Sequence, residues 1–204
     1  MEREKVIEFV KNLKLNEHAV LIYTNPKDKQ DTLFTYLKAG LDKGEAAVYV
    51  ASEETPEEIR QAMQRFGIDV DQHERDGALK IIDYRNWYLM DGKFDVSRSL
   101  SLWRKLLEES KSRSFQGLRV TGEASWFLER NMVDELVEYE RALHRVLDIP
   151  MTAICAYNSK LLVSKEEWFN LLIQILNMHS TAIMLGQKGL GATTPDEILV
   201  TMAL

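Results

Sequence analysis

Short apolar runs alternate along the chain with longer stretches in which apolar residues recur at every third or fourth position. The runs predict strands that are buried on both sides, and the longer spacing predicts helices with one apolar face. We predict strands over about 19–23, 46–51, 79–83, 118–121, 151–157 and 181–185. We predict helices over about 31–42, 55–66, 95–112, 132–147 and 164–178, with an amphipathic helix within 1–15 and a short helix from 194. This alternation indicates an α/β fold with a doubly wound, mainly parallel sheet flanked by helices.

Residues at the expected helix ends agree with this division. Capping-box sequences begin at Thr55 and at Ser164, each with a glutamate three residues later, and such boxes satisfy the free amides of a helix start. The segment 186–194 contains three glycines and is the one stretch that we expect to be flexible. We therefore predict one domain over 1–185, followed by a glycine-containing hinge and a helical tail over 186–204.

The order of the first elements is that of a phosphate-loop ATPase, but the phosphate loop is missing. Such an enzyme needs GxxxxGK[ST] between the first strand and helix, because glycine amides and a lysine must reach the phosphates. Residues 24–31 read TNPKDKQD, without glycine and with two aspartates that would repel phosphate. We expect Lys27 and Lys29 to lie in a solvated loop. We also expect neither ATP nor Mg²⁺, nor any other cofactor.

Composition narrows the classes of function. The chain has 204 residues, of which 45% are apolar and 28% charged, and its net charge is −6. An acidic balance argues against direct nucleic-acid binding, which requires a basic face. The lone cysteine, Cys155, rules out an internal disulfide framework and indicates a reducing cytoplasm. There is no uninterrupted apolar stretch of membrane-spanning length, and the charged N-terminal segment is not a signal peptide.

Ligands of open α/β sheets collect beyond the carboxyl ends of the strands. Polar and aromatic residues stand in or just after several predicted strands and should converge on one edge. The candidate ligand-binding residues are Tyr23, Arg119, Glu123, Trp126, Cys155 and Tyr157.

Each candidate also has a structural interpretation. Arg119 interrupts an apolar strand and needs a buried partner, for which Glu123 or a ligand carboxylate would serve, although an internal salt bridge is the simpler role. Trp126 could be a core residue and Cys155 a small buried hydrophobe. Glu123 could be an acid that is stabilised by a helix N-terminus.

Two histidines stand at the other ends of strands. His18 precedes the first predicted strand and His179 precedes the last, so both should lie at the amino-terminal edge. That position separates them from Cys155, which we expect near the carboxyl edge. We therefore predict no metal site.

Two stretches resemble known families. The run GLDKGEAAVYVASEE, at 40–54, resembles RecA/KaiC-type ATPases. The block GLRVTGEASW, at 117–126, is more specific. Together with His18, Tyr23, EYE at 138–140 and ICAY at 154–157, it resembles the MEDS domain, a sensory domain of methanogens and methylotrophs. The likeness covers about residues 16–185.

The resemblance implies a RecA-like fold that lost its phosphate loop and became a sensor of small hydrocarbon derivatives in archaeal methanogens and related organisms. It implies that the six candidates above, with His18 and His179, are the characteristic positions. Family members occur alone or joined to helix-turn-helix or kinase modules, and this chain carries neither, so we expect output through a protein partner. The proline that commonly follows the last histidine is Ser180 here.

These observations lead to three hypotheses. The first is a non-catalytic sensory domain that binds a small organic molecule at the carboxyl edge, near Tyr23, Glu123, Trp126 and Cys155. The second is a pseudo-ATPase subunit of a RecA-like homo-oligomer. The third is a residual ATPase in which a glutamate, one of Glu53, Glu54 and Glu123, acts as general base and magnesium-linked acid.

Overall fold

The computed structural model describes residues 2–146, 151–163, 169–186 and 189–193. One sheet has the strand order β3-β2-β6-β7-β1-β8-β9. Its first six strands run parallel, and β9 runs antiparallel to β8 at the edge. The strands are β1 (His18–Tyr23), β2 (Ala46–Ala51), β3 (Leu79–Asp83), β6 (Leu118–Glu123), β7 (Met151–Asn158), β8 (Thr181–Gly186) and β9 (Gly189–Thr193). The predicted α/β fold with a mainly parallel sheet is confirmed.

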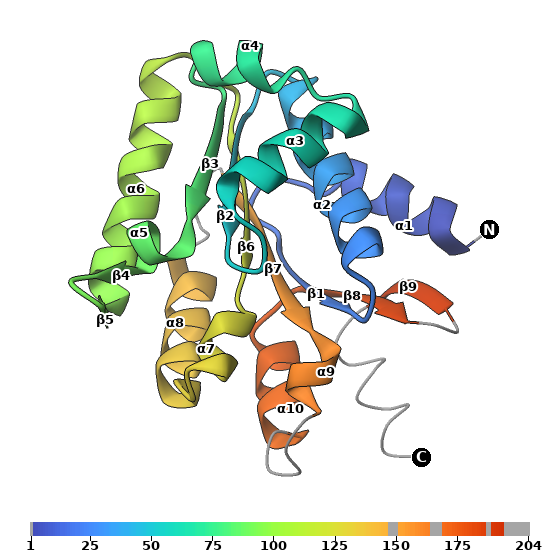
Figure 1. Cartoon of the computed structure of the whole chain (residues 1–204), viewed down its shortest axis with the longest axis vertical. Helices are drawn as coiled ribbons and strands as arrows, with labels where there is room; N and C mark the ends of the chain where they lie inside the picture. Colours follow the sequence, from blue (N-terminus) through green and yellow to red (C-terminus); the bar gives the residue numbers. More distant parts are fainter. Residues whose placement is uncertain (1, 147–150, 164–168, 187–188, 194–204) are drawn as a thin grey trace.

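Helices cover both faces of the sheet (Figure 1). The first face carries α1 (Glu2–Lys11), α2 (Pro26–Leu41), α3 (Pro56–Phe66) and α4 (Val70–Arg75). The second face carries α5 (Tyr84–Tyr88), α6 (Val96–Ser112), α7 (Ser125–Glu129), α8 (Val133–Val146), α9 (Ser159–Leu162) and α10 (Phe169–Asn177), with a hairpin of β4 (Leu89–Met90) and β5 (Lys93–Phe94). Along β1, Leu21 packs into the first core and Val20 into the second. Strand β1 therefore serves two cores, which is why its sequence is apolar without alternation.

The capping signal before α3 forms as predicted. The Thr55 hydroxyl accepts a hydrogen bond from the Glu58 amide at 3.2 Å, and the Glu58 carboxylate accepts one from the Thr55 amide at 2.8 Å. The helix ends at Gly67, whose φ of 96° is left-handed, a conformation that costs glycine little.

Helix α2 begins five residues earlier than its apolar spacing suggests. It starts at Pro26, and the Asn25 side chain accepts a hydrogen bond from the Lys27 amide at 2.9 Å. Asparagine at the cap followed by proline is a helix-start signal. The predicted solvated loop at 24–31 is therefore wrong, and only Thr24 and Asn25 connect β1 to α2.

The predicted glycine hinge also differs from the structure. Gly189–Thr193 forms β9, which pairs with β8 from Gly186↔Gly189 to Ala182↔Thr193. Backbone pairing to an open sheet edge orders a segment whose composition alone favours flexibility. The capping box at 164–167 and the terminal helix from 194 lie outside the described residues. Within the described part of the chain, no helix is long and apolar enough to cross a membrane.

Candidate functional site

A fully buried lysine lies at the carboxyl edge of the sheet, surrounded by three carboxylates. The Nζ atom of Lys29 is 2.6 Å from Oε1 of Glu123, 2.8 Å from Oε2 of Glu54 and 3.1 Å from Oε2 of Glu53. Lys29 and Glu123 are fully buried, whereas the side chains of Glu53 and Glu54 are 20% and 21% exposed. These four residues are called the Lys29 cluster below. Burying a charge is costly unless opposite charges and hydrogen bonds replace water, and here they do.

Glu123 uses both of its carboxylate oxygens. Oε1 accepts hydrogen bonds from Lys29 and, at 2.6 Å, from the Tyr49 hydroxyl. Oε2 accepts from the backbone amides of Ser52 at 2.6 Å and Glu53 at 2.7 Å. A carboxylate with these four donors has little capacity left to hold Mg²⁺ or to take a proton from water.

Within the Lys29 cluster, Lys29 and Glu123 stabilise each other's charge. Burial by itself would lower the pKa of Lys29, but Glu123 and Glu53 outweigh it and hold that pKa above its usual value. Burial would raise the pKa of Glu123, but Lys29 and the Glu53 amide hold it below its usual value. Burial, reinforced by the charge of Glu123, raises the pKa of Glu54. Lys29 is therefore a cation at neutral pH and Glu123 an anion.

Sequence reasoning missed the burial of Lys29. Lys27, two residues earlier, matches the solvated expectation, since its side chain is 77% exposed. Lys29 points inward because α2 already begins at Pro26, so position 29 falls within a helix that packs on the sheet. The signal that could have revealed it was the Asn25-Pro26 helix start.

A second buried cluster lies on the other face of the sheet. The Nε2 atom of His18 is 3.3 Å from Sγ of Cys155, and Oε2 of Glu140 is 3.4 Å from Nε2 of both His18 and His179. The two imidazole rings are 4.0 Å apart between centroids. These four residues, all buried, are called the histidine–cysteine cluster.

The register of the sheet explains how the histidine–cysteine cluster forms. Cys155 pairs with Val20, two residues along β1 from His18, so it lies in the middle of β7 and not at the carboxyl edge. The expected separation of Cys155 from both histidines is therefore wrong. Glu140, from α8, completes the cluster. In the sequence it stands out only as part of the EYE motif at 138–140.

Hydrogen bonds fix two members of the histidine–cysteine cluster. The Nδ1 atom of His179 is 2.7 Å from the Ile175 carbonyl oxygen. The Tyr157 hydroxyl donates to Oε1 of Glu140. Burial lowers the pKa of His18 and raises that of the Cys155 thiol. Tyr157, a predicted site residue, thus supports this cluster.

The remaining predicted residues occupy separate places. The Tyr23 hydroxyl donates to Glu53, so Tyr23 adjoins the Lys29 cluster. Arg119 forms the expected internal salt bridge, but its partner is Glu45 and not Glu123. Arg119 is the second residue of β6 and Glu123 is the last, so the two side chains lie near opposite ends of the strand.

Trp126 lies in an aromatic cluster just beyond the end of β6. Its ring centroid is 3.8 Å from that of Phe127, 5.1 Å from Tyr84, 5.5 Å from Tyr88 and 6.0 Å from Phe94. Its Nε1 atom is buried and has no hydrogen-bond partner among the described residues. We call these five residues the aromatic cluster. The six predicted residues therefore do not form one site but adjoin several.

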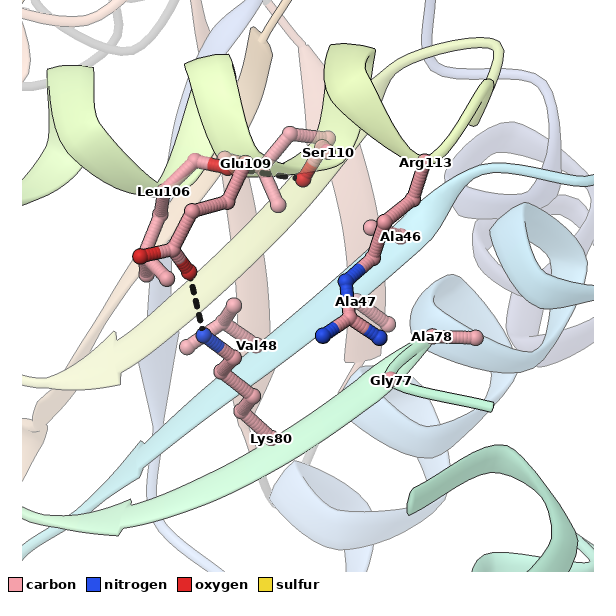
Figure 2. Close-up of a pocket in the computed structure, with 11 residues that line it drawn as sticks. Ala46, Ala47, Val48, Gly77, Ala78, Lys80, Leu106, Glu109, Ser110 and Arg113 are labelled. Atoms are coloured by element: carbon pink, nitrogen blue, oxygen red, sulfur yellow. Dashed lines mark hydrogen bonds and ion pairs between the residues drawn. The ribbon is translucent and has the colours of Figure 1, made fainter. Parts of the chain in front are cut away.

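Two cavities lie away from these clusters. Figure 2 shows a crevice between β2, β3 and α6, where Lys80 pairs with Glu109 at 2.7 Å and the Arg113 guanidinium lies beside Gly77 and Ala78. Its volume of about 10 Å³ is the space of a single water molecule. A groove of about 600 Å³ runs between α1 and α2, on the first face.

The chain is similar to several known proteins. The family model of the MEthanogen/methylotroph, DcmR Sensory domain matches residues 17–180. Curated relatives include UPF0273 proteins of Pyrobaculum aerophilum, 44% identical over 88 residues, and of Thermotoga maritima, 32% identical over 69 residues. These matches cover 38% and 33% of this chain and 31% and 28% of the relatives, so the chain spans less than a third of either.

A solved structure gives the fold. The KaiC-like protein of Pyrococcus horikoshii superposes with a TM-score of 0.60 at 17% sequence identity, covering 87% of this chain and 77% of that one. The fold is therefore KaiC-like and of RecA type.

Proposed function

The chain belongs to the methanogen/methylotroph, DcmR sensory domain family, and we propose that it is a non-catalytic sensory domain that binds a small organic molecule and signals through a partner protein. The observation that carries the proposal is the Lys29 cluster. In a nucleotide-binding relative this edge would receive phosphates and a metal ion. Here the ammonium group of Lys29 occupies the carboxyl edge and is held there by all three carboxylates.

Loss of phosphate binding is the first part of the proposal. The amino terminus of α2 is capped by Asn25 instead of by an anion. The Lys29 ammonium group is held by the carboxylates of the Lys29 cluster, so one positive charge faces three negative charges. A phosphate group would meet net repulsion there.

The aromatic cluster is the proposed place for the ligand. It adjoins the carboxyl edge, and three of its residues come from α5 and the β4–β5 hairpin, in which Met90 is 55% exposed. The unpartnered Nε1 of Trp126 would donate to an acceptor atom of the ligand, because an unsatisfied buried donor costs free energy. The ligand would be small, mostly apolar and equipped with one hydrogen-bond acceptor.

A route from ligand to output follows from the chain connectivity. Trp126 is three residues beyond Glu123, and the Ser52 hydroxyl donates to the Glu123 carbonyl oxygen at 3.2 Å. A ligand that displaces Trp126 would therefore favour a second packing of the loops at the carboxyl edge. A partner protein would contact those loops.

The test is calorimetric titration with a panel of small methylated and halogenated compounds. Trp126→Phe keeps an aromatic ring but removes the free N–H. The loss of one hydrogen bond to the ligand should raise the Kd about tenfold. Trp103→Phe is the matched control, because that indole already donates to the Tyr139 hydroxyl at 2.9 Å. The proposal is overturned if no compound binds, or if the two variants lose affinity equally.

The oligomer alternative rests on the likeness in fold to a KaiC-like protein. As a pseudo-ATPase subunit, the chain would use the Lys29 cluster to hold the edge rigid without nucleotide. Light scattering that gives a ring-sized mass would favour this function. A monomer mass at the concentrations used for binding would exclude it.

A further inference from the structure

Four side chains with metal-binding atoms converge on the second face of the sheet, and nothing in the sensory proposal uses them. We propose that His18, Glu140, Cys155 and His179 bind a divalent transition-metal ion of the zinc type. The proposal does not depend on the small organic ligand, because the metal site and the aromatic cluster have no residue in common.

Three of the distances between donor atoms match the edges of a tetrahedral site. Nitrogen and oxygen ligands lie about 2.0–2.1 Å from zinc and thiolate sulfur about 2.3 Å, so the edges of the tetrahedron measure about 3.3–3.7 Å. The distances from His18 Nε2 to Cys155 Sγ and from Glu140 Oε2 to both histidine Nε2 atoms are 3.3, 3.4 and 3.4 Å. All four donor atoms lie within 4.8 Å of one another.

The surrounding contacts orient two of the four ligands, His179 and Glu140, in the way that metal sites require. Histidine ligands commonly donate their second ring nitrogen to a carbonyl or carboxylate. The Ile175 carbonyl lies 2.7 Å from Nδ1 of His179, which leaves Nε2 facing the cluster. The Tyr157 hydroxyl binds Oε1 of Glu140 and leaves Oε2 facing the cluster. Neither inward-facing atom has a hydrogen-bond partner among the described residues.

A cation would stabilise the buried carboxylate of the histidine–cysteine cluster. Glu140 is fully buried, and the described residues place no lysine or arginine in an ion pair with it. The comparison with Glu123 is direct, because that buried carboxylate has Lys29 at 2.6 Å. A divalent ion beside Cys155 and Glu140 would balance a thiolate and a carboxylate, whereas an unpaired buried charge is strongly destabilising.

The ligand set selects the kind of ion. Two imidazoles, one thiolate and one carboxylate suit zinc and its chemical neighbours, whereas Mg²⁺ and Ca²⁺ prefer oxygen ligands. Four protein ligands fill a tetrahedron, which is typical of a structural site. The ligands come from β1, β7 and α8 and from the turn before β8, so the ion would join four separate segments of the chain.

The test begins with the wild-type chain. Elemental analysis after equilibration with Zn²⁺ and desalting should give about one ion per chain. Removal by a chelator and addition of Co²⁺ should give the thiolate-to-cobalt charge-transfer band and the intense visible bands of tetrahedral cobalt. Saturating Zn²⁺, at about a thousand times its Kd, should raise the Tm of the apo protein by roughly 8–16 °C.

Variants assign the ligands. Cys155→Ser should abolish the charge-transfer band, and His179→Gln should reduce zinc to background. His144→Ala is the matched control, because this exposed histidine lies near the cluster, with its ring 6.1 Å from that of His18, and is not a ligand. It should bind zinc as the wild type does, and a loss equal to that in His179→Gln would overturn the assignment. If a variant does not fold, the wild type still decides: folded wild-type protein that binds neither Zn²⁺ nor Co²⁺ leaves only a hydrogen-bonded core cluster and overturns the proposal.

Discussion

Replacing Lys29 by methionine removes the one ammonium group from the Lys29 cluster while keeping most of its volume. Glu123 would remain fully buried, with its tyrosine and amide donors but without its ion-pair partner at 2.6 Å. Removing one member of a buried ion pair typically costs about 3–5 kcal/mol, because the other charge is left uncompensated. For a domain of this size, we expect the Tm to fall by roughly 6–20 °C.

The pH dependence of the variant gives a sharper signature than the loss of stability. In the wild type the pKa of Glu123 is lowered, so its contribution is present above the unfolded pKa of about 4.3 and is lost as pH falls through the folded value. In Lys29→Met burial dominates, and the pKa of Glu123 should rise above the unfolded value. The deficit relative to wild type should therefore be largest at pH 7–8 and shrink toward pH 5.

Urea unfolding followed by circular dichroism, repeated across this pH range, measures both effects. Lys27→Met is the matched control, since that exposed lysine forms an ion pair with Asp31 one turn along the same helix, and pairs of exposed side chains contribute about 0–1 kcal/mol. Glu123→Gln in the Lys29→Met background should restore part of the lost stability at pH 7. A Lys29→Met protein that matches the Lys27→Met control at every pH would refute the account of the Lys29 cluster.

Two further changes test other parts of the structure. Gly40→Ala would place a Cβ 2.5 Å from Cδ of Arg119, so we expect the free energy of unfolding in urea to fall by about 1–3 kcal/mol. Lys38→Ala, on the same helix, is the control, and equal stability of the two variants would contradict the observed packing. Tyr157→Phe removes the hydrogen bond to Glu140 and should weaken Zn²⁺ binding about 10–100-fold in a chelator competition assay; unchanged affinity would show that Glu140 needs no such support.

The fold was predictable because its signals are local. Apolar runs such as AVLIY after His18 and the capping box at Thr55 specify their elements without reference to distant residues. The start of α2 was missed although its signal, Asn25-Pro26, is equally local. The same residues occupy the position of a phosphate loop between the first strand and helix, and their lack of glycine favours a loop only in that comparison.

The clusters were less predictable because their members are far apart in sequence. The carboxylates around Lys29 are 24, 25 and 94 residues away, and Cys155 is 137 residues from His18. Only the strand order and register bring them together. Arg119 was partly predictable. Its place in an apolar strand indicates a buried ion pair, but nothing in the sequence identifies Glu45 as the partner.

The most direct test of the central claim is a thermal-shift titration of the purified chain with MgATP. If the Lys29 cluster has replaced phosphate binding, the Tm should stay unchanged at millimolar MgATP, while a compound from the organic panel raises it. A ligand at a hundred times its Kd adds about 2.7 kcal/mol, which corresponds to a rise of roughly 5–10 °C. A rise of that size with MgATP would contradict the claim and restore the residual ATPase as the function to test.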